Sequence, residues 1–134
     1  MNKILLFVWI IFGFTKLMAQ APALSEGFKK QYEGKWSAAS KYQNNTIEIK
    51  FEPGKNYAIV IDIGSGEAPP VRMRAFQKNN ILTIAPALHQ NDYCELEIKN
   101  GKLIFRTQST IWTEEGKPKP PGKFFAKKVF SKVK

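Results

Sequence analysis

Two side chains, each of a type that occurs once in this sequence, are the first candidates for nucleophilic catalysis or for binding a metal. His89 is the only histidine and Cys94 the only cysteine, and they stand close together in the chain. A cysteine thiolate acts as a nucleophile when a neighbouring histidine takes its proton. A zinc site, in contrast, needs three or four nitrogen, sulfur or oxygen ligands in fixed geometry. One histidine and one cysteine do not supply such a set, so the thiol is the stronger candidate for chemistry.

The thiol of Cys94 is nevertheless expected to be inert. Its place in an apolar strand pattern indicates a small buried hydrophobic residue, with no neighbour that would lower its pKa. The sequence also contains no Walker A loop and no G-x-G-x-x-G, H-E-x-x-H or G-x-S-x-G pattern. We therefore expect a protein that is not an enzyme and that uses no cofactor and no metal ion.

The elements that would position these residues are strands. Apolar and polar residues alternate along most of the chain after Glu33, and turn signals separate the runs. Such a pattern is typical of an all-β sandwich or barrel. We predict an eight-stranded antiparallel up-and-down barrel with one short N-terminal helix, with an open half-barrel or a two-sheet sandwich as the alternative. The predicted strands span 35–43, 46–52, 57–63, 71–77, 81–85, 93–99, 102–110 and 123–131.

Local signals locate the helix and one hairpin. The segment 22–34 fits a short helix, whose first turn Ser25 is able to cap. Asn100-Gly101 is a strong signal for a type I′ turn, because both central positions of that turn need positive φ. A two-residue loop there sets Glu95 opposite Arg106 on the exposed face. On the apolar face it pairs Ile98 with Leu103, Leu96 with Phe105 and Cys94 with Thr107.

The turn over 52–56 is predicted from burial alone. Ile47, Ile49 and Phe51 share one strand face, and the larger apolar residues of the next strand begin at Tyr57. An even loop would set Phe51 against Ala58 and divide the two apolar sets between the faces of the sheet. Since a slip by one residue reverses every side chain, we predict a three-residue loop with Phe51 opposite Tyr57.

The N-terminus has the layout of a secretory signal peptide. Lys3 precedes the apolar run 4–14, small residues follow, and Ala19-Gln20-Ala21 is a candidate cleavage site. The run is too short to span a bilayer. A lipid anchor is not expected, because no cysteine lies near the cleavage site. We expect residues 1–20 to be removed and residues 21–134 to form one exported domain, periplasmic or secreted. An uncleaved N-terminal anchor is the alternative, because Lys16 follows the apolar run.

Positive charge is concentrated at the C-terminal end. The formal net charge of +10 falls to +8 without Lys3 and Lys16, and no acidic residue follows Glu115. Such an end could bind an acidic protein, an acidic glycan or lipid head groups, whereas export makes nucleic acid an unexpected partner. The alternative is a solvated face that prevents edge-to-edge pairing of the last strand. The lysines expected on an anion-binding surface are Lys117, Lys119, Lys123 and Lys132.

The order of these elements resembles the lipocalin (calycin) superfamily. A short helix, then Gly34-x-Trp36 at the head of the first strand, then an antiparallel meander together cover nearly all of 21–134. The resemblance implies that Trp36 closes one end of the barrel beneath the helix. It also implies a cation on the Trp36 ring from the last strand, which would be Lys127 or Lys128. The length is closer to the short lipocalin-like domains that Gram-negative bacteria export.

A barrel of eight strands is either filled by its own side chains or holds one small ligand. We favour a monomeric binding protein for a small apolar or amphipathic molecule, and keep a filled core as the alternative. Arg72 and Arg74 are expected on the face opposite Met73. The residues expected to line the interior are Tyr57, Ile59, Ile61, Met73, Leu96, Phe105 and Trp112.

Two other classes of function fit the same fold. One is an inhibitor or interaction protein that binds through the loops 64–70, 86–92 and 113–122. The other is a binder of anionic surfaces through the lysine-rich end. Added salt would weaken the last of these and would leave an apolar pocket largely unaffected.

Overall fold

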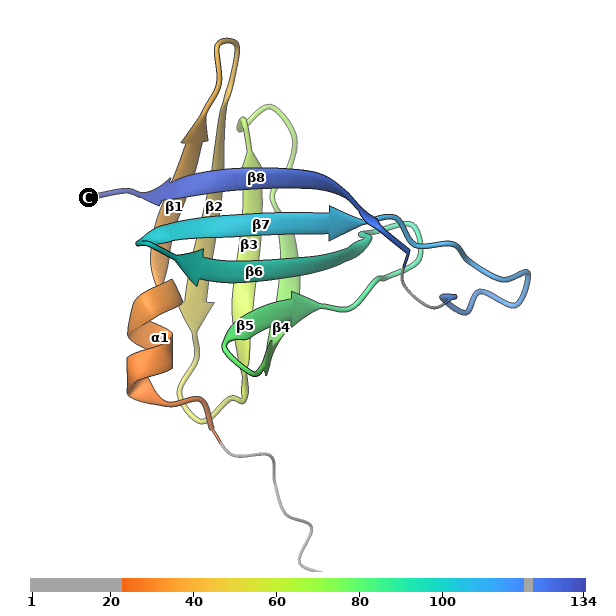
Figure 1. The fold of residues 1–134 in the computed structure, drawn as a ribbon, viewed down its shortest axis with the longest axis horizontal. Coiled ribbons are helices and arrows are strands. Elements are labelled where there is room, and N and C mark those ends of the chain that lie inside the picture. Colours follow the sequence, from red (N-terminus) through yellow and green to blue (C-terminus); the bar gives the residue numbers. More distant parts are fainter. Residues whose placement is uncertain (1–22, 120–121) are drawn as a thin grey trace, which may run out of the picture.

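The computed structural model describes residues 23–119 and 122–134 (Figure 1). One short helix precedes eight antiparallel strands, which close into a barrel in sequence order, as predicted. The expected signal peptide, residues 1–20, lies outside the described residues. The elements are α1 (Glu26–Tyr32), β1 (Gly34–Ala39), β2 (Asn44–Phe51), β3 (Tyr57–Gly64), β4 (Val71–Lys78), β5 (Ile81–Ile84), β6 (Tyr93–Lys99), β7 (Lys102–Gln108) and β8 (Phe124–Lys132).

The helix α1 begins and ends through specific contacts. Ser25 caps it, since its hydroxyl accepts a hydrogen bond from the Phe28 N–H at 3.2 Å. Phe28 and Tyr32 turn inward and are buried against the barrel. The Tyr32 hydroxyl donates to the Asn80 carbonyl at 2.8 Å and accepts from the Ile98 N–H at 3.4 Å. These bonds join α1 to the turn before β5 and to the end of β6.

The barrel is built from two groups of strands that cross. In Figure 1, β1 to β4 run upright, and β6, β7 and β8 pass across them. Apolar side chains of both groups of strands meet in the space between the groups, and this space is the barrel interior. The fully buried members include Trp36, Ile47, Ile49, Val60, Leu82, Leu96 and Leu103. One continuous core therefore fills most of the barrel.

The hairpin of β6 and β7 has the predicted register. Asn100 and Gly101 have φ values of 51° and 72°, as a type I′ turn requires. The predicted pairs all occur, from Ile98 with Leu103 to Cys94 with Thr107. Glu95 lies opposite Arg106 as predicted, but these side chains are partly buried rather than exposed, and Arg106 also binds Glu97 at 2.8 Å.

The predicted register of β2 and β3 is wrong. Phe51 pairs with Ala58 and Ile49 with Val60, so the loop between the strands is even. Pro53 and Gly54 occupy the centre of a tight turn, with the Lys55 N–H bonded to the Glu52 carbonyl and Gly54 at φ 73°. Proline followed by a glycine of positive φ is typical of a type II turn, whose geometry overrides the burial argument.

The consequence is that β3 turns its smaller side chains inward. Ala58 and Val60 are fully buried in the core, where they face Ala75 and Met73 of β4. The interior of an eight-stranded barrel is narrow, so small residues on one side make room for larger residues on the other. Met73 points inward, and Arg72 and Arg74 lie on the opposite face, as predicted.

The closure between β1 and β8 is short. The two strands pair only at Trp36 with Lys132 and Ser37 with Ser131, and the Val133 N–H bonds to the Lys35 carbonyl at 2.9 Å. On its other side β8 pairs with β7 along almost its whole length. Residues 124–130 therefore have a β-strand partner on one side only, in the part of the chain that the structure describes. This free edge of β8 is where the barrel opens.

Candidate functional site

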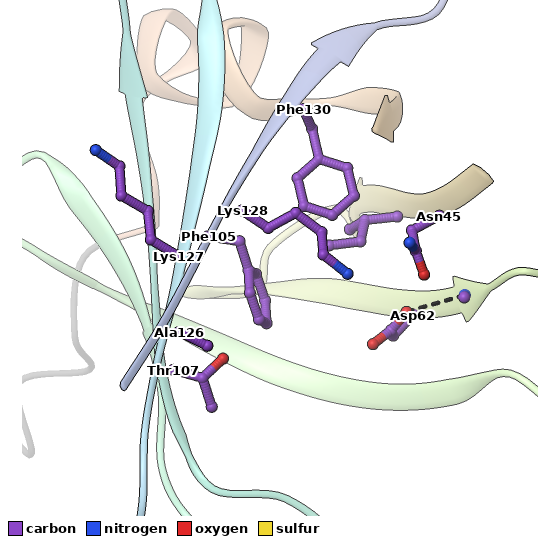
Figure 2. A pocket seen from close by; sticks show the side chains of 10 residues that line it. Asn45, Asp62, Phe105, Thr107, Ala126, Lys127, Lys128 and Phe130 are labelled. Carbon is purple, nitrogen blue, oxygen red and sulfur yellow. Dashed lines mark hydrogen bonds between the residues drawn. The ribbon is translucent and has the colours of Figure 1, made fainter. Parts of the chain in front are cut away.

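A cavity of about 210 Å³ lies inside the barrel beside the free edge of β8. Its walls come from β2, β3, β7 and β8, which are distant in sequence but meet at this opening (Figure 2). Ile47, Phe105, Ala126 and Phe130 form the apolar wall. The polar lining residues are Asn45, Asp62, Thr107, Lys127 and Lys128. We call this space the β8 cavity.

The aromatic wall is a packed pair. The rings of Phe105 and Phe130 have their centroids 6.4 Å apart and meet edge to face at 70°. Phe130 is buried and Phe105 is half-buried at the cavity surface. Ring pairs of this geometry are held by the ring quadrupoles in addition to their apolar area. The wall is therefore a stable apolar surface that faces the polar groups of β2 and β3.

The register of β2 and β3 directs Asp62 into the cavity. Ile47 pairs with Asp62 in the same register in which Ile49 pairs with Val60, and the register shifts only beyond this pair, where Thr46 pairs with Gly64. Because Ile47 faces the core, its partner Asp62 faces inward as well. The Asp62 Oδ1 atom accepts a hydrogen bond from the Gly64 N–H at 3.0 Å, and Gly64 has φ 57°. This local bond holds the carboxylate at the cavity wall.

Lys127 and Lys128 lie on opposite faces of β8. Lys128 pairs with Phe105 and shares its inward face, whereas Lys127 pairs with Arg106 on the outer face. In Figure 2 the Lys128 side chain extends toward Asn45 and Asp62, and Lys127 extends away on the other side of β8. Lys128 therefore brings an ammonium group to the cavity, at a position open to solvent.

The sequence-predicted interior residues divide into three groups. Leu96 and Met73 point inward and pack in the core, and Phe105 lines the β8 cavity. Tyr57, Ile59 and Ile61 were expected to point inward, but the register of β3 places them on the outer face. Trp112 lies outside the barrel, where it forms an isolated bridge with Pro118 in the segment after β7.

The outward-facing residues of β3 can be apolar because neighbouring side chains shield them from water. Ile59 is only 4 % exposed although it faces outward, between its cross-strand partners Lys50 and Arg74. The Arg74 guanidinium lies 4.9 Å from the centroid of the Tyr57 ring. Long cationic side chains cover apolar surface with their stems while their charges stay in water. An apolar run in β3 was therefore no guide to the inner face.

The cation over Trp36 is Lys132, and neither Lys127 nor Lys128 takes that place. The Trp36 ring is buried, its Nε1–H donates to the Tyr32 carbonyl at 2.8 Å, and the Lys132 Nζ atom lies 5.4 Å from its centroid. Trp36 and Lys132 are cross-strand partners, so strand pairing brings them together. Lys132 is exposed, so its place on an anion-binding surface stays a prediction.

The remaining surface lysines are exposed on the segment after β7 and at the start of β8. Lys117 pairs with Glu115 at 3.3 Å, and both side chains are largely exposed. Lys119 and Lys123 are also exposed. Exposed ion pairs contribute little free energy, so Lys117 stays available to other anions.

His89 and Cys94 do not form a catalytic pair in the described geometry. His89 is exposed in the loop after β5, whereas Cys94 is buried and its thiol donates to the Asp92 carbonyl at 3.4 Å. Burial raises the pKa of the Cys94 thiol to about 11, so very little thiolate exists at neutral pH. Within the described ranges no group of three or more histidine, cysteine, aspartate or glutamate side chains is placed to hold a metal ion.

Three features of the site were missed by sequence reasoning: Asp62 in the cavity, Lys128 as its inward-facing cation, and Lys132 on Trp36. Gly64, two residues after Asp62, was the one local signal of a bulge. In residues 23–119 and 122–134 no helix is long and apolar enough to cross a membrane. Comparisons with protein-family models, with curated proteins and with solved structures find no match to this chain.

Proposed function

We propose that this protein is an exported, non-enzymatic binding protein of the lipocalin type, and that the β8 cavity holds a small amphipathic molecule. The observation that carries this proposal is the cavity of about 210 Å³, with an aromatic wall and a few polar groups, at the open edge of β8. Ligand sites in proteins are concave and mostly apolar, with few polar groups that orient the ligand.

The size of the cavity narrows the class of ligand. Drug-sized ligands occupy pockets of roughly 300–1,000 Å³, and about 210 Å³ lies below that range. A molecule that fits must be small, or must leave part of its length outside. The exposed positions of Ala126 and Lys128 allow a ligand to reach the cavity from the side of the barrel.

Kinship with lipocalins and export are supported by separate observations. The buried Trp36 beneath α1, with Lys132 on its ring, accords with the barrel end that the lipocalin resemblance implies. Export rests on the signal-like pattern of residues 1–20. If the full chain is expressed in a Gram-negative host, we expect the protein in the periplasm or medium with an N-terminus near residue 20 or 21. A product that keeps Met1 and stays with the membranes would contradict export.

Binding is tested with a neutral apolar fluorophore, N-phenyl-1-naphthylamine, titrated into the mature protein. We expect a saturable rise in fluorescence. Ala126→Phe fills the cavity from β8 and should abolish that rise, because Ala126 shares the inward face with Thr107. Val129→Phe on the outer face of the same strand is the matched control and should bind as the wild type does. No saturable signal, or an equal loss in both variants, would overturn the proposal.

A further inference from the structure

We propose that the β8 cavity selects a small zwitterion with an apolar body, such as an apolar α-amino acid, with its cationic group at Asp62 and its anionic group at Lys128. This inference rests on the proposed binding function and specifies its ligand class. It is drawn from the unlike charges of Asp62 and Lys128, which line one cavity; the third charged lining residue, Lys127, extends to the other side of β8 (Figure 2).

Asp62 and Lys128 do not form an ion pair with each other. Six ion pairs occur among the described residues, and none includes Asp62 or Lys128. Asp62 uses Oδ1 to accept from the Gly64 N–H, and its Oδ2 atom accepts no hydrogen bond from the described part of the chain. A carboxylate and an ammonium on facing strands, without a direct pair, leave space for a ligand group at each.

Charge complementarity distinguishes the possible occupants. An anion at Lys128 would meet the nearby Asp62 carboxylate, and a cation at Asp62 would meet the Lys128 ammonium. Like charges in one site repel, and a neutral ligand would gain no ionic contact from either group. A zwitterion whose two charges are separated by a few bonds satisfies both groups at once.

The apolar wall supplies the remaining contact. Phe105 and Phe130 stand on β7 and β8 beside Lys128, and Ile47 stands beside Asp62 on the neighbouring strand. An aliphatic or aromatic side chain placed between them would be removed from water. About 210 Å³ suits a body of this size better than a long acyl chain.

The experiment compares three probes that share one body and differ in charge. L-Leucine is a zwitterion, N-acetyl-L-leucine is only anionic, and L-leucinamide is only cationic. Isothermal titration with the mature protein should show leucine binding about tenfold more tightly than either analogue, since a hydrogen bond to a charged group contributes about that factor. Dodecylphosphocholine is a fourth probe, and binding as tight as that of leucine would assign the zwitterion to a lipid head group.

Two variants assign the charges to their residues. Lys128→Met should remove the preference for the carboxylate, so that leucine and leucinamide bind alike. Asp62→Asn keeps an oxygen for the Gly64 N–H and should remove the preference for the ammonium, so that leucine and N-acetyl-leucine bind alike. Lys99→Met, at an exposed lysine of β6 that does not line the cavity, is the control and should leave all affinities within about twofold of wild type, as expected for surface changes.

The outcomes separate this inference from the proposed function. If the neutral fluorophore binds but leucine binds no better than its analogues, the zwitterion proposal fails and the binding function stands. If neither the fluorophore nor leucine binds, both fail. An equal loss in Lys99→Met and Lys128→Met would also overturn the proposal, because the effect would then be one of overall charge.

Discussion

The Nζ atom of Lys132 lies 5.4 Å from the centroid of the Trp36 ring, and its Cε atom lies 3.1 Å from the position that a Cβ atom would take at Gly34. The Lys132 side chain thus passes over Gly34, at the start of β1, and reaches the indole ring of Trp36. The same two strands pair at only two positions, so this contact lies where the barrel closes. The close approach explains why glycine stands two residues before the tryptophan.

The contact between Lys132 and Trp36 should contribute measurably to stability. Since Lys132 is exposed, Lys132→Met should lower the free energy of unfolding by about 0.5–1 kcal/mol, because methionine retains an apolar stem without the charge. Lys132→Arg should restore most of the loss. Urea unfolding followed by far-UV circular dichroism gives the comparison, with Lys127→Met as the control. An unchanged midpoint for Lys132→Met would contradict an energetic role.

Gly34 should tolerate no side chain. Its φ of 126° is a conformation that residues with a Cβ rarely adopt, and a Cβ there would press on Lys132. Gly34→Ala should therefore destabilise the protein by about 1–3 kcal/mol. Gly27→Ala in α1 is the matched control, since a Cβ there meets nothing within 4 Å and the φ is not positive. It should be neutral or stabilise by about 0.5–1 kcal/mol. Equal effects in both variants would contradict the structural reason.

The register of β2 and β3 is tested by adjacent residues of β3. Val60 is fully buried in the core, and Ile61 lies on the outer face. Val60→Lys buries an unpaired charge and should prevent folding, whereas Ile61→Lys should change the free energy of unfolding by no more than about 1 kcal/mol. Far-UV circular dichroism and urea unfolding measure both. If Ile61→Lys prevented folding and Val60→Lys did not, the register with Phe51 opposite Tyr57 would be the correct one.

Stability should fall at alkaline pH partly through Cys94. Burial raises the pKa of the folded Cys94 thiol to about 11, from 9.0 for a cysteine in water. A raised folded pKa means that the unfolded state loses its proton first, so the contribution is complete below pH 9 and is lost as pH rises toward 11. Between pH 8 and 10.5 the wild type should lose about 1–2 kcal/mol more than Cys94→Ala. Parallel pH profiles of unfolding in the two proteins would contradict this.

Local chemistry made much of the fold predictable. Alternation of apolar and polar residues indicated all eight strands, because a strand with one buried face has a period of two. Ser25 and Asn100-Gly101 were equally informative, since a helix cap and a type I′ turn depend on a few adjacent residues. Their observed positions differ from the predicted ones only at strand ends.

Local sequence patterns were enough to predict the all-β architecture, the helix start and the register of β6 and β7. The face of β3 that lies inside, the lysine over Trp36 and the charges that line the β8 cavity became clear only from the folded barrel. The reason is that these relations depend on pairing between strands far apart in the chain. A turn, a bulge or a short closure shifts that pairing by one residue, and one residue reverses the face of every side chain that follows.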